Sequence, residues 1–276
     1  MHLGLEKKVV LLTGELTRIP GSFHLECNDT NSAVGGTKGI GRTMVRAFLE
    51  EGAIVHFCSR TEADIKAANE KLATDFPNAK AIGSTVDIAD QSQLTDWVNS
   101  CAEQSGKIDV LVSNVSALAI PDTPESWTNT FQLDLLSLHI FVQTALPHLE
   151  KSKGNIVTIS SVSGRDIDFT TPGPYGPAKA AVIHYTASLA RSLAPKGMRA
   201  NTCSPGNIYI ADGTWGGIEK SMPDLFEKQF AQNPTGRMGK PEEVANAVLF
   251  LASEKASFVS GTNFCVDGAL CQGVQF

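Results

Sequence analysis

The chain has 276 residues, of which 42% are hydrophobic and 19% charged, a composition typical of globular rather than disordered proteins. Its formal net charge of −6 argues against binding to a nucleic-acid backbone, and no apolar run reaches the length of a membrane span. The first residues lack the apolar core and the cleavage site of a secretion signal, so we expect a cytoplasmic protein without nucleic-acid or membrane partners.

Short apolar runs alternate with helical patterns along the chain. Runs typical of buried strands cover 9–12, 54–58, 81–86, 108–112, 155–159, 200–203 and 263–266. Helical patterns between them cover 41–51, 62–75, 91–104, 125–150, 174–194 and 242–253, with a loop-and-helix segment at 209–233. This alternation predicts βαβ units. We therefore expect an α/β fold, a single doubly wound Rossmann domain over 1–276, with a seven-stranded parallel sheet in the order 3-2-1-4-5-6 and the seventh strand at the edge.

A glycine-rich segment opens the first predicted helix. Its residues are Gly35, Gly36, Thr37, Lys38, Gly39, Ile40 and Gly41. Glycines allow the backbone to approach a pyrophosphate closely, and a helix N-terminus supplies amide groups and a favourable dipole. Because tight turns rich in glycine are common, the segment predicts a nucleotide site only in combination with further motifs.

A tyrosine and a lysine four residues apart form the second motif. Tyr175 and Lys179 would share one face of a helix, where the ammonium group favours the phenolate and lowers its pKa. We therefore expect the phenol to titrate below the value of about 10 of a free tyrosine. The preceding strand ends at Ser160 and Ser161, which could add a hydroxyl to the pair.

The order of these motifs resembles that of the short-chain dehydrogenase/reductase family, and in particular of 3-oxoacyl-carrier-protein reductases. The resemblance covers nearly the whole chain. Besides the glycine turn and the Tyr-x-x-x-Lys pair, it rests on Val86-Asp87, Asn114, Ser161, Ser204-Pro205-Gly206, the segment 236–243, and Ser260-Gly261 followed by Val266-Asp267-Gly268.

The resemblance implies catalytic roles for three residues. Tyr175 would pass a proton to a carbonyl oxygen while a hydride leaves a nicotinamide. Lys179 would hold the nicotinamide ribose and lower the pKa of the tyrosine, and Ser161 would hydrogen-bond the substrate oxygen. The family also implies a homodimer or a homotetramer built on the last helices.

The resemblance implies cofactor contacts as well, from Asp87 at the adenine, Asn114 on the adenosine side and the backbone of Ile208 at the carboxamide. The second predicted strand is followed by Arg60, and Lys38 lies in the glycine turn. A guanidinium suits the 2′-phosphate of NADP(H), whereas a carboxylate would suit the free 2′-hydroxyl of NAD(H). Both cations therefore favour NADP(H), unless they are solvated surface charges.

The chain departs from the family pattern between the first strand and the glycine turn. About twenty extra residues, 15–34, separate Thr13-Gly14 from Gly35, and deleting them would restore the family's pattern almost completely. Long loops without structure are uncommon inside compact domains. We consider two hypotheses, a mobile insertion over the cofactor phosphates and sequence translated from an unremoved intron. Sequencing the mature transcript distinguishes them.

Two further departures concern the catalytic residues. Asp134 stands where the family has a helix asparagine that helps to order a water beside the lysine. It could keep that role through its backbone carbonyl while adding a charge, or it could be an ordinary polar residue of the helix. Ser161 precedes Tyr175 by one residue more than is commonest in the family, so Ser160 and Ser163 remain alternatives.

The substrate region is the least readable part of the sequence. The segment 209–233 contributes Trp215, Met222, Leu225, Phe226 and Phe230, and loops elsewhere contribute Leu118, Ile120 and Phe169. These side chains would line a largely apolar pocket, or they would pack a lid or a subunit interface. We expect Asp166 and Asp168 to be solvated loop acids.

The sequence thus favours an NADPH-dependent oxidoreductase that reversibly converts a ketone to a secondary alcohol. Its expected catalytic residues are Ser161, Tyr175, Lys179 and Asp134, its substrate is small and apolar, and it needs no metal. The alternative is a cofactor-binding or interaction protein on the same scaffold, catalytically impaired by the segment 15–34 and by Asp134.

Overall fold

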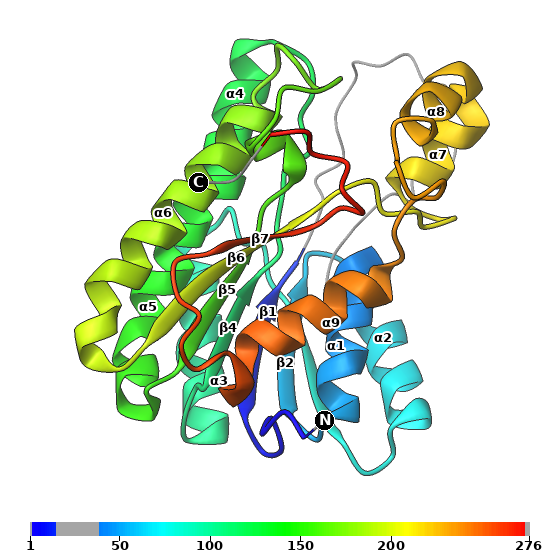
Figure 1. Ribbon diagram of the computed structural model, residues 1–276. Coiled ribbons are helices and arrows are strands. Elements are labelled where there is room, and N and C mark those ends of the chain that lie inside the picture. The colour runs from blue at the N-terminus through cyan, green and yellow to red at the C-terminus, as the bar shows by residue number, and fades with distance from the viewer. Residues whose placement is uncertain (1, 15–38, 274–276) are drawn as a thin grey trace.

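The computed structural model describes residues 2–14 and 39–273. The segment 15–34 and four residues of the predicted glycine turn, Gly35, Gly36, Thr37 and Lys38, lie outside the described residues. At the centre is a parallel sheet in the order β3-β2-β1-β4-β5-β6-β7 (Figure 1). Its strands are β1 (Val9–Thr13), β2 (Ile54–Ser59), β3 (Lys80–Thr85), β4 (Val110–Ser113), β5 (Asn155–Ile159), β6 (Arg199–Pro205) and β7 (Asn263–Val266). The predicted fold and strand order are confirmed, with β1 central.

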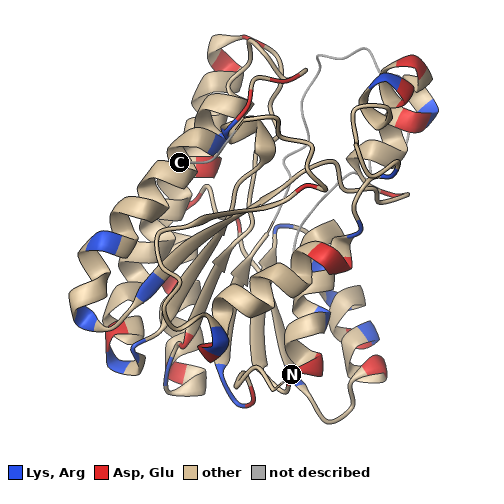
Figure 2. Cartoon of the chain, viewed as in Figure 1, with Lys and Arg blue, Asp and Glu red and all other residues tan. Residues whose placement is uncertain are grey.

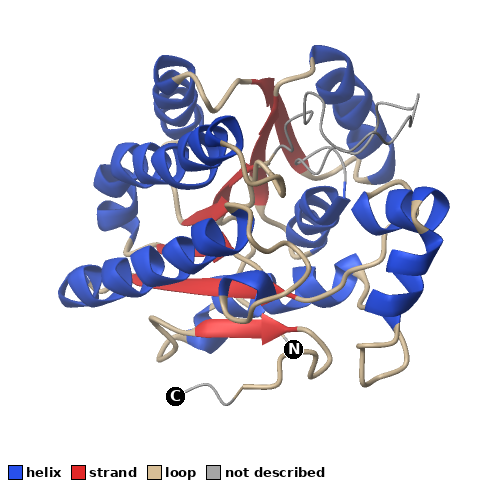
Figure 3. Ribbon diagram, turned by 90° about the horizontal axis from the view of Figure 1, so that it is seen from above, coloured by secondary structure: helices blue, strands red, loops and turns tan. Residues whose placement is uncertain are grey.

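Helices cover both faces of the sheet (Figure 3). One face carries α1 (Gly39–Glu50), α2 (Glu62–Asp75) and α9 (Pro241–Ala252). The other face carries α3 (Gln91–Ser105), α5 (Ser137–Ser152) and α6 (Tyr175–Leu193). Successive side chains of a strand point to opposite faces, so β1 supplies Val9 and Leu11 to one hydrophobic cluster and Val10 and Leu12 to the other. This two-sided burial explains why the strands read as continuous apolar runs.

Charged side chains lie mainly on the helices and loops around the sheet (Figure 2). The only lysines, arginines, aspartates or glutamates in the seven strands are Lys80 and Arg199, and each is the first residue of its strand. Within residues 2–14 and 39–273, no helix is long and apolar enough to cross a membrane, and no group of His, Cys, Asp and Glu side chains could hold a metal ion.

The helix predicted over 125–150 is interrupted by a turn of a different type. It consists of α4 (Pro124–Thr130), a π-helical turn η1 (Phe131–Leu136) and α5. A π-helical turn closes i→i+5 hydrogen bonds and so contains one residue more than an α-helical turn. This extra residue changes the direction in which the side chains of the turn project, and Asp134 at its centre is buried against α6. Such turns often occur at functional sites.

The remaining helices, α7 (Thr214–Ser221) and α8 (Pro223–Phe230), lie beyond the carboxyl ends of the strands, opposite α4 in the view of Figure 1. In doubly wound sheets, ligands bind at these strand ends. Several of the predicted catalytic and cofactor-binding residues follow the ends of β2, β4, β5 and β6. This edge of the sheet is therefore the candidate site.

Candidate active site

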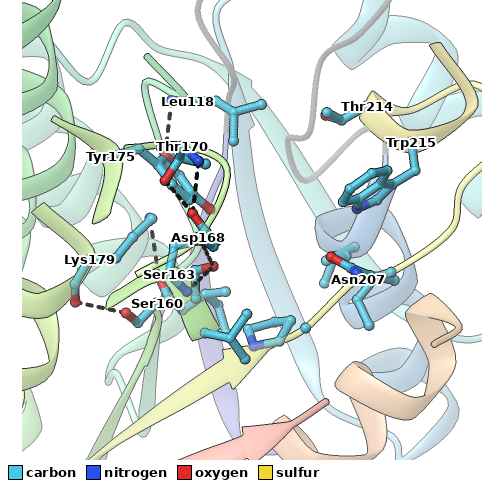
Figure 4. Close-up of a pocket in the computed structure, with 18 of the residues that line it drawn as sticks. Leu118, Ser160, Ser163, Asp168, Thr170, Tyr175, Lys179, Asn207, Thr214 and Trp215 are labelled. Carbon is cyan, nitrogen blue, oxygen red and sulfur yellow. Dashed lines mark hydrogen bonds between the residues drawn. The ribbon is translucent and has the colours of Figure 1, made fainter. Parts of the chain in front are cut away.

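A cavity opens at the carboxyl ends of β4, β5 and β6 (Figure 4). The loop after β5, the first turns of α6, the loop after β4 and the start of α7 form its walls. Its polar lining consists of Asn114, Ser116, Ser160, Ser161, Ser163, Asp168, Thr170, Tyr175, Lys179, Asn207 and Thr214. Its apolar lining includes Ile40, Leu118, Ile120, Phe169, Ile208, Ile210, Trp215 and Ile218. Three of the four predicted catalytic side chains, Ser161, Tyr175 and Lys179, thus line the cavity, and the fourth, Asp134, contacts Lys179.

Tyr175 and Lys179 lie on one face of α6, as their spacing predicts. Tyr175 is the first residue of the helix, and the Lys179 ammonium nitrogen lies 5.7 Å from the centre of its ring. The lysine is almost completely buried. Its ammonium group contacts the Asp134 carboxylate at 3.1 Å and donates longer hydrogen bonds of 3.4 Å to the carbonyls of Val115 and Ile159. Because the two longer bonds are weak, the ammonium can exchange them for a ligand hydroxyl.

The Asp134 side chain is held by three groups. Oδ1 accepts a hydrogen bond of 2.6 Å from the Ala117 amide, and Oδ2 accepts one of 2.8 Å from Ser116 Oγ besides its contact with Lys179. The side chain is 0% exposed and that of Lys179 is 3% exposed, so the pair is a buried ion pair. Asp134 is therefore not an ordinary polar residue of a helix surface. It balances the charge of Lys179 and anchors the loop after β4.

Of the three candidate serines, Ser161 is the one that hydrogen-bonds Tyr175. Ser160 Oγ points the other way and donates a bond of 2.8 Å to the Lys179 carbonyl. Ser163 Oγ accepts a bond of 3.2 Å from Ser161 Oγ and donates to the Asp168 carboxylate. The geometry therefore favours Ser161 as the hydroxyl beside the reacting oxygen, and it leaves Ser160 and Ser163 in supporting positions.

The expected direction of the Tyr175 pKa was wrong. Burial raises the pKa of Tyr175 above the ordinary value of a tyrosine. The Lys179 charge and the Ser161 hydrogen bond lower it, but the carboxylates of Asp134 and Asp168 raise it further. The spacing of Tyr175 and Lys179 indicates only the effect of the lysine. Because the phenol keeps its proton at neutral pH, Tyr175 is suited to donate that proton.

Asp134→Asn should shift the pH dependence of the reaction. The amide keeps the size of the side chain and removes one of the negative charges that raise the pKa of Tyr175. Alcohol oxidation needs the deprotonated phenol, so its rate should rise at a lower pH than in the parent protein. Initial rates of oxidation between pH 6 and 11 would measure this.

Asp75→Asn serves as the matched control, because Asp75 pairs with Arg46 on the far side of the sheet. Its profile should match that of the parent. An unchanged profile for Asp134→Asn, or a shift to higher pH, would contradict the assigned electrostatic role.

The predicted cofactor residues that the structure describes lie at the ends of neighbouring strands. Arg60 follows β2, Asp87 follows β3 and Asn114 follows β4. The buried amide nitrogen of Asn114 has no hydrogen-bond partner among the described residues. Asp87 Oδ1 accepts a bond of 2.9 Å from the Ala89 amide, which fixes the turn.

The first turn of α1 and the segment after β6 complete this row of strand ends. Gly39 begins α1 with a φ of +59°, and Ile40 and Ile208 line the cavity. The N-terminus of α1, the carboxyl ends of the strands and the amide nitrogen of Asn114, unpaired within the described part of the chain, together fit a nucleotide cofactor.

The aromatic residues of 209–233 divide into two groups. Trp215 reaches the cavity together with Leu118, Ile120 and Phe169, which confirms a largely apolar wall. The other apolar residues predicted in 209–233 pack behind that wall. Met222, Leu225 and Phe226 surround a small cluster of Trp215, Ile218 and Met238. Phe230 stacks on Phe226.

Asp168 was wrongly expected to be a solvated loop acid. Its carboxylate lines the cavity beside Tyr175, where it accepts hydrogen bonds from Ser163 and Thr170. Nothing in the local sequence indicates this, because the position of the carboxylate depends on how the loop after β5 folds back onto α6.

Sequence comparisons agree with this geometry. The model of the family described as Enoyl-(Acyl carrier protein) reductase matches residues 34–270. The chain belongs to the short-chain dehydrogenase/reductase family. This family membership covers β2 to β7 and all of the catalytic residues discussed above.

Several members of this family are similar over most of their length. Isoepoxydon dehydrogenase of Penicillium expansum is 40% identical over 88% of this chain and 94% of its own. L-fucose dehydrogenase of Bos taurus is 36% identical over 85% of this chain and 86% of its own. A solved structure of 7α-hydroxysteroid dehydrogenase, complexed with NADH and 7-oxo glycochenodeoxycholic acid, is 25% identical over 99% of this chain and 98% of its own, with a TM-score of 0.81. The chain is thus an oxidoreductase of a family that acts on alcohols and ketones with a nicotinamide cofactor.

Proposed function

We propose that the protein is an NADPH-dependent carbonyl reductase that converts a ketone to a secondary alcohol and can run in reverse. The observation that supports this most directly is the arrangement of Ser161, a Tyr175 that keeps its proton, and Lys179 around one cavity with a largely apolar wall. The relatives named as dehydrogenases of isoepoxydon and L-fucose support the same reaction class. A cytoplasmic homodimer or homotetramer remains part of the proposal.

Each residue of the site has a separate role in the reaction. When bound, the nicotinamide supplies a hydride to the carbonyl carbon. Ser161 holds the carbonyl oxygen by a hydrogen bond, and Tyr175 gives the phenol proton to that oxygen as negative charge develops on it. Lys179 stabilises the phenolate that remains, and the tyrosine then regains a proton from solvent. In the reverse direction, the phenolate accepts the alcohol proton.

The proposal is tested by following NADPH oxidation with a panel of cyclic and linear ketones. Turnover of at least one ketone is expected from the full chain, and a variant without residues 15–34 shows whether that segment affects it. If neither protein oxidises NADPH with any ketone, the impaired-scaffold interpretation replaces this one.

The preference for NADPH rests on Arg60. Arg60→Asp removes a guanidinium at the end of β2 and places a carboxylate where the 2′-phosphate would lie. The dissociation constant for NADPH should rise about tenfold or more, while that for NADH changes much less. Titration of the cofactor's fluorescence measures both constants.

Lys66→Asp on α2 is the matched control, because it makes the same change of net charge at an exposed position of the next helix. It should leave the ratio of the two constants unchanged. If Arg60→Asp retains the parental preference for NADPH, Arg60 does not select the cofactor.

A further inference from the structure

The carboxylate of Asp168 distinguishes this cavity from a purely apolar one. Asp168 lies between Thr170 and Ser163 and beside Tyr175 (Figure 4). Ser163, Thr170 and Tyr175 surround it, and apolar side chains, among them Leu118, Phe169 and Trp215, line other parts of the cavity. A carboxylate is costly to place in such surroundings unless its oxygens are satisfied.

The hydrogen bonds of Asp168 leave one position open. Oδ1 accepts bonds of 2.9 Å from the Thr170 amide and 2.6 Å from Thr170 Oγ1, and Oδ2 accepts from Ser163 Oγ. A carboxylate has about four acceptor positions, so a further donor can bind Oδ2. Among the described residues, no lysine or arginine forms an ion pair with Asp168. A donor on a molecule in the cavity can therefore occupy this position.

The open position also lies close to the reacting centre. Ser161 Oγ donates a bond of 3.2 Å to Ser163 Oγ, which in turn donates to Asp168 Oδ2. The carboxylate is thus two hydrogen bonds from the serine that would hold the carbonyl oxygen. A small molecule whose carbonyl oxygen lies at Ser161 could therefore place a hydrogen-bond donor, a few atoms from that carbonyl, at Asp168 Oδ2.

We propose that the substrate is a ketone carrying a second, free hydroxyl group, which donates a hydrogen bond to Asp168 Oδ2 when the carbonyl lies at Ser161 and Tyr175. This deepens the proposed function and depends on it. The apolar wall holds the carbon skeleton, and the negative charge of Asp168 disfavours ketones with a carboxylate or phosphate at that position. Asp168 is therefore a specificity-determining residue, and its Oδ1 bonds to Thr170 fix its orientation.

The test compares three kinds of ketone with one skeleton, namely cyclohexanone, its 2-, 3- and 4-hydroxy derivatives, and the methyl ethers of those derivatives. The parent protein should prefer the best hydroxy ketone over its methyl ether by about 10- to 100-fold in kcat/KM, mainly through KM. In Asp168→Asn, the amide can still accept from Thr170 but offers no second carboxylate oxygen. The ratio between hydroxy ketone and ether should therefore fall to about one, whatever happens to the common rate.

Thr170→Val is the control for a merely structural role, because it removes a donor to Oδ1 and leaves Oδ2 in place. Whatever its effect on the common rate, it should keep the ratio. The proposal is overturned if the parent does not distinguish hydroxy ketone from ether, if Asp168→Asn keeps the parental ratio, or if an aminoketone is preferred over every hydroxy ketone. If the parent reduces cyclohexanone but shows no such preference, only this inference fails. If it reduces no ketone, the proposed function fails with it.

Discussion

Tyr175→Phe should reduce carbonyl reduction by about 10²–10⁴-fold, because it deletes the transferable proton and keeps the ring. Binding of the cofactor should change little, since the buried pair of Lys179 and Asp134 and the residues at the strand ends remain. Stopped-flow or steady-state rates with a ketone measure the first effect, and fluorescence titration with NADPH measures the second. The loss should appear in kcat, because the proton moves only in the transition state.

Tyr185→Phe is a matched control, since Tyr185 lies on the same helix and its hydroxyl contacts His139 outside the cavity. It should retain the parental turnover. A Tyr175→Phe protein with nearly parental reductase activity would remove the tyrosine from the mechanism and support a non-redox role for the scaffold.

Lys179→Met should be both inactive and less stable. The substitution leaves the carboxylate of Asp134 buried without its cation, and breaking one side of a buried ion pair costs about 3–5 kcal/mol. For a chain of this size, this corresponds to a fall in Tm on the order of 10 °C. Catalysis should fall as well, because the charge that stabilises the phenolate is lost. Differential scanning calorimetry and the ketone assay measure the two effects.

The double variant Lys179→Met with Asp134→Asn separates the two effects. An amide in place of the carboxylate removes the unpaired charge but can still accept a hydrogen bond from Ala117. Most of the lost Tm should return, and the activity should not. If Lys179→Met is as stable as the parent, the ion pair contributes little, and if the double variant regains turnover, Lys179 is not needed for catalysis.

The parts of the fold that were predictable are those set by local pattern. Runs such as Val9–Leu12 are buried on both sides, which produces the apolar stretches and, with the intervening helices, the strand order. The i, i+4 spacing of Tyr175 and Lys179 likewise follows from helix geometry alone. These features need no knowledge of distant residues.

The features that were missed depend on contacts between distant segments. The raised pKa of Tyr175 results from burial and from two carboxylates, Asp134 and Asp168, that the fold brings to it from separate parts of the chain. The π-helical turn has no proline or glycine to mark it in Phe131–Leu136. The position of Asp168 depends on the path of a loop. Sequence patterns report local preferences, so these properties could be read only from the structure.

The π-helical turn has a consequence for protein engineering. Because the turn contains one residue more than an α-helical turn, deleting one residue can alter the site, as a substitution can. Removing one residue from 131–136 would allow α4 and α5 to form a continuous α-helix, in which each residue of the joined segment is displaced by about 100° around the axis. The buried face of α5 holds that helix in place, so the rotation falls on the residues before it. Deleting Leu135 or Leu136 would thus turn the Asp134 carboxylate away from Lys179 and would also displace Leu133 of the hydrophobic core.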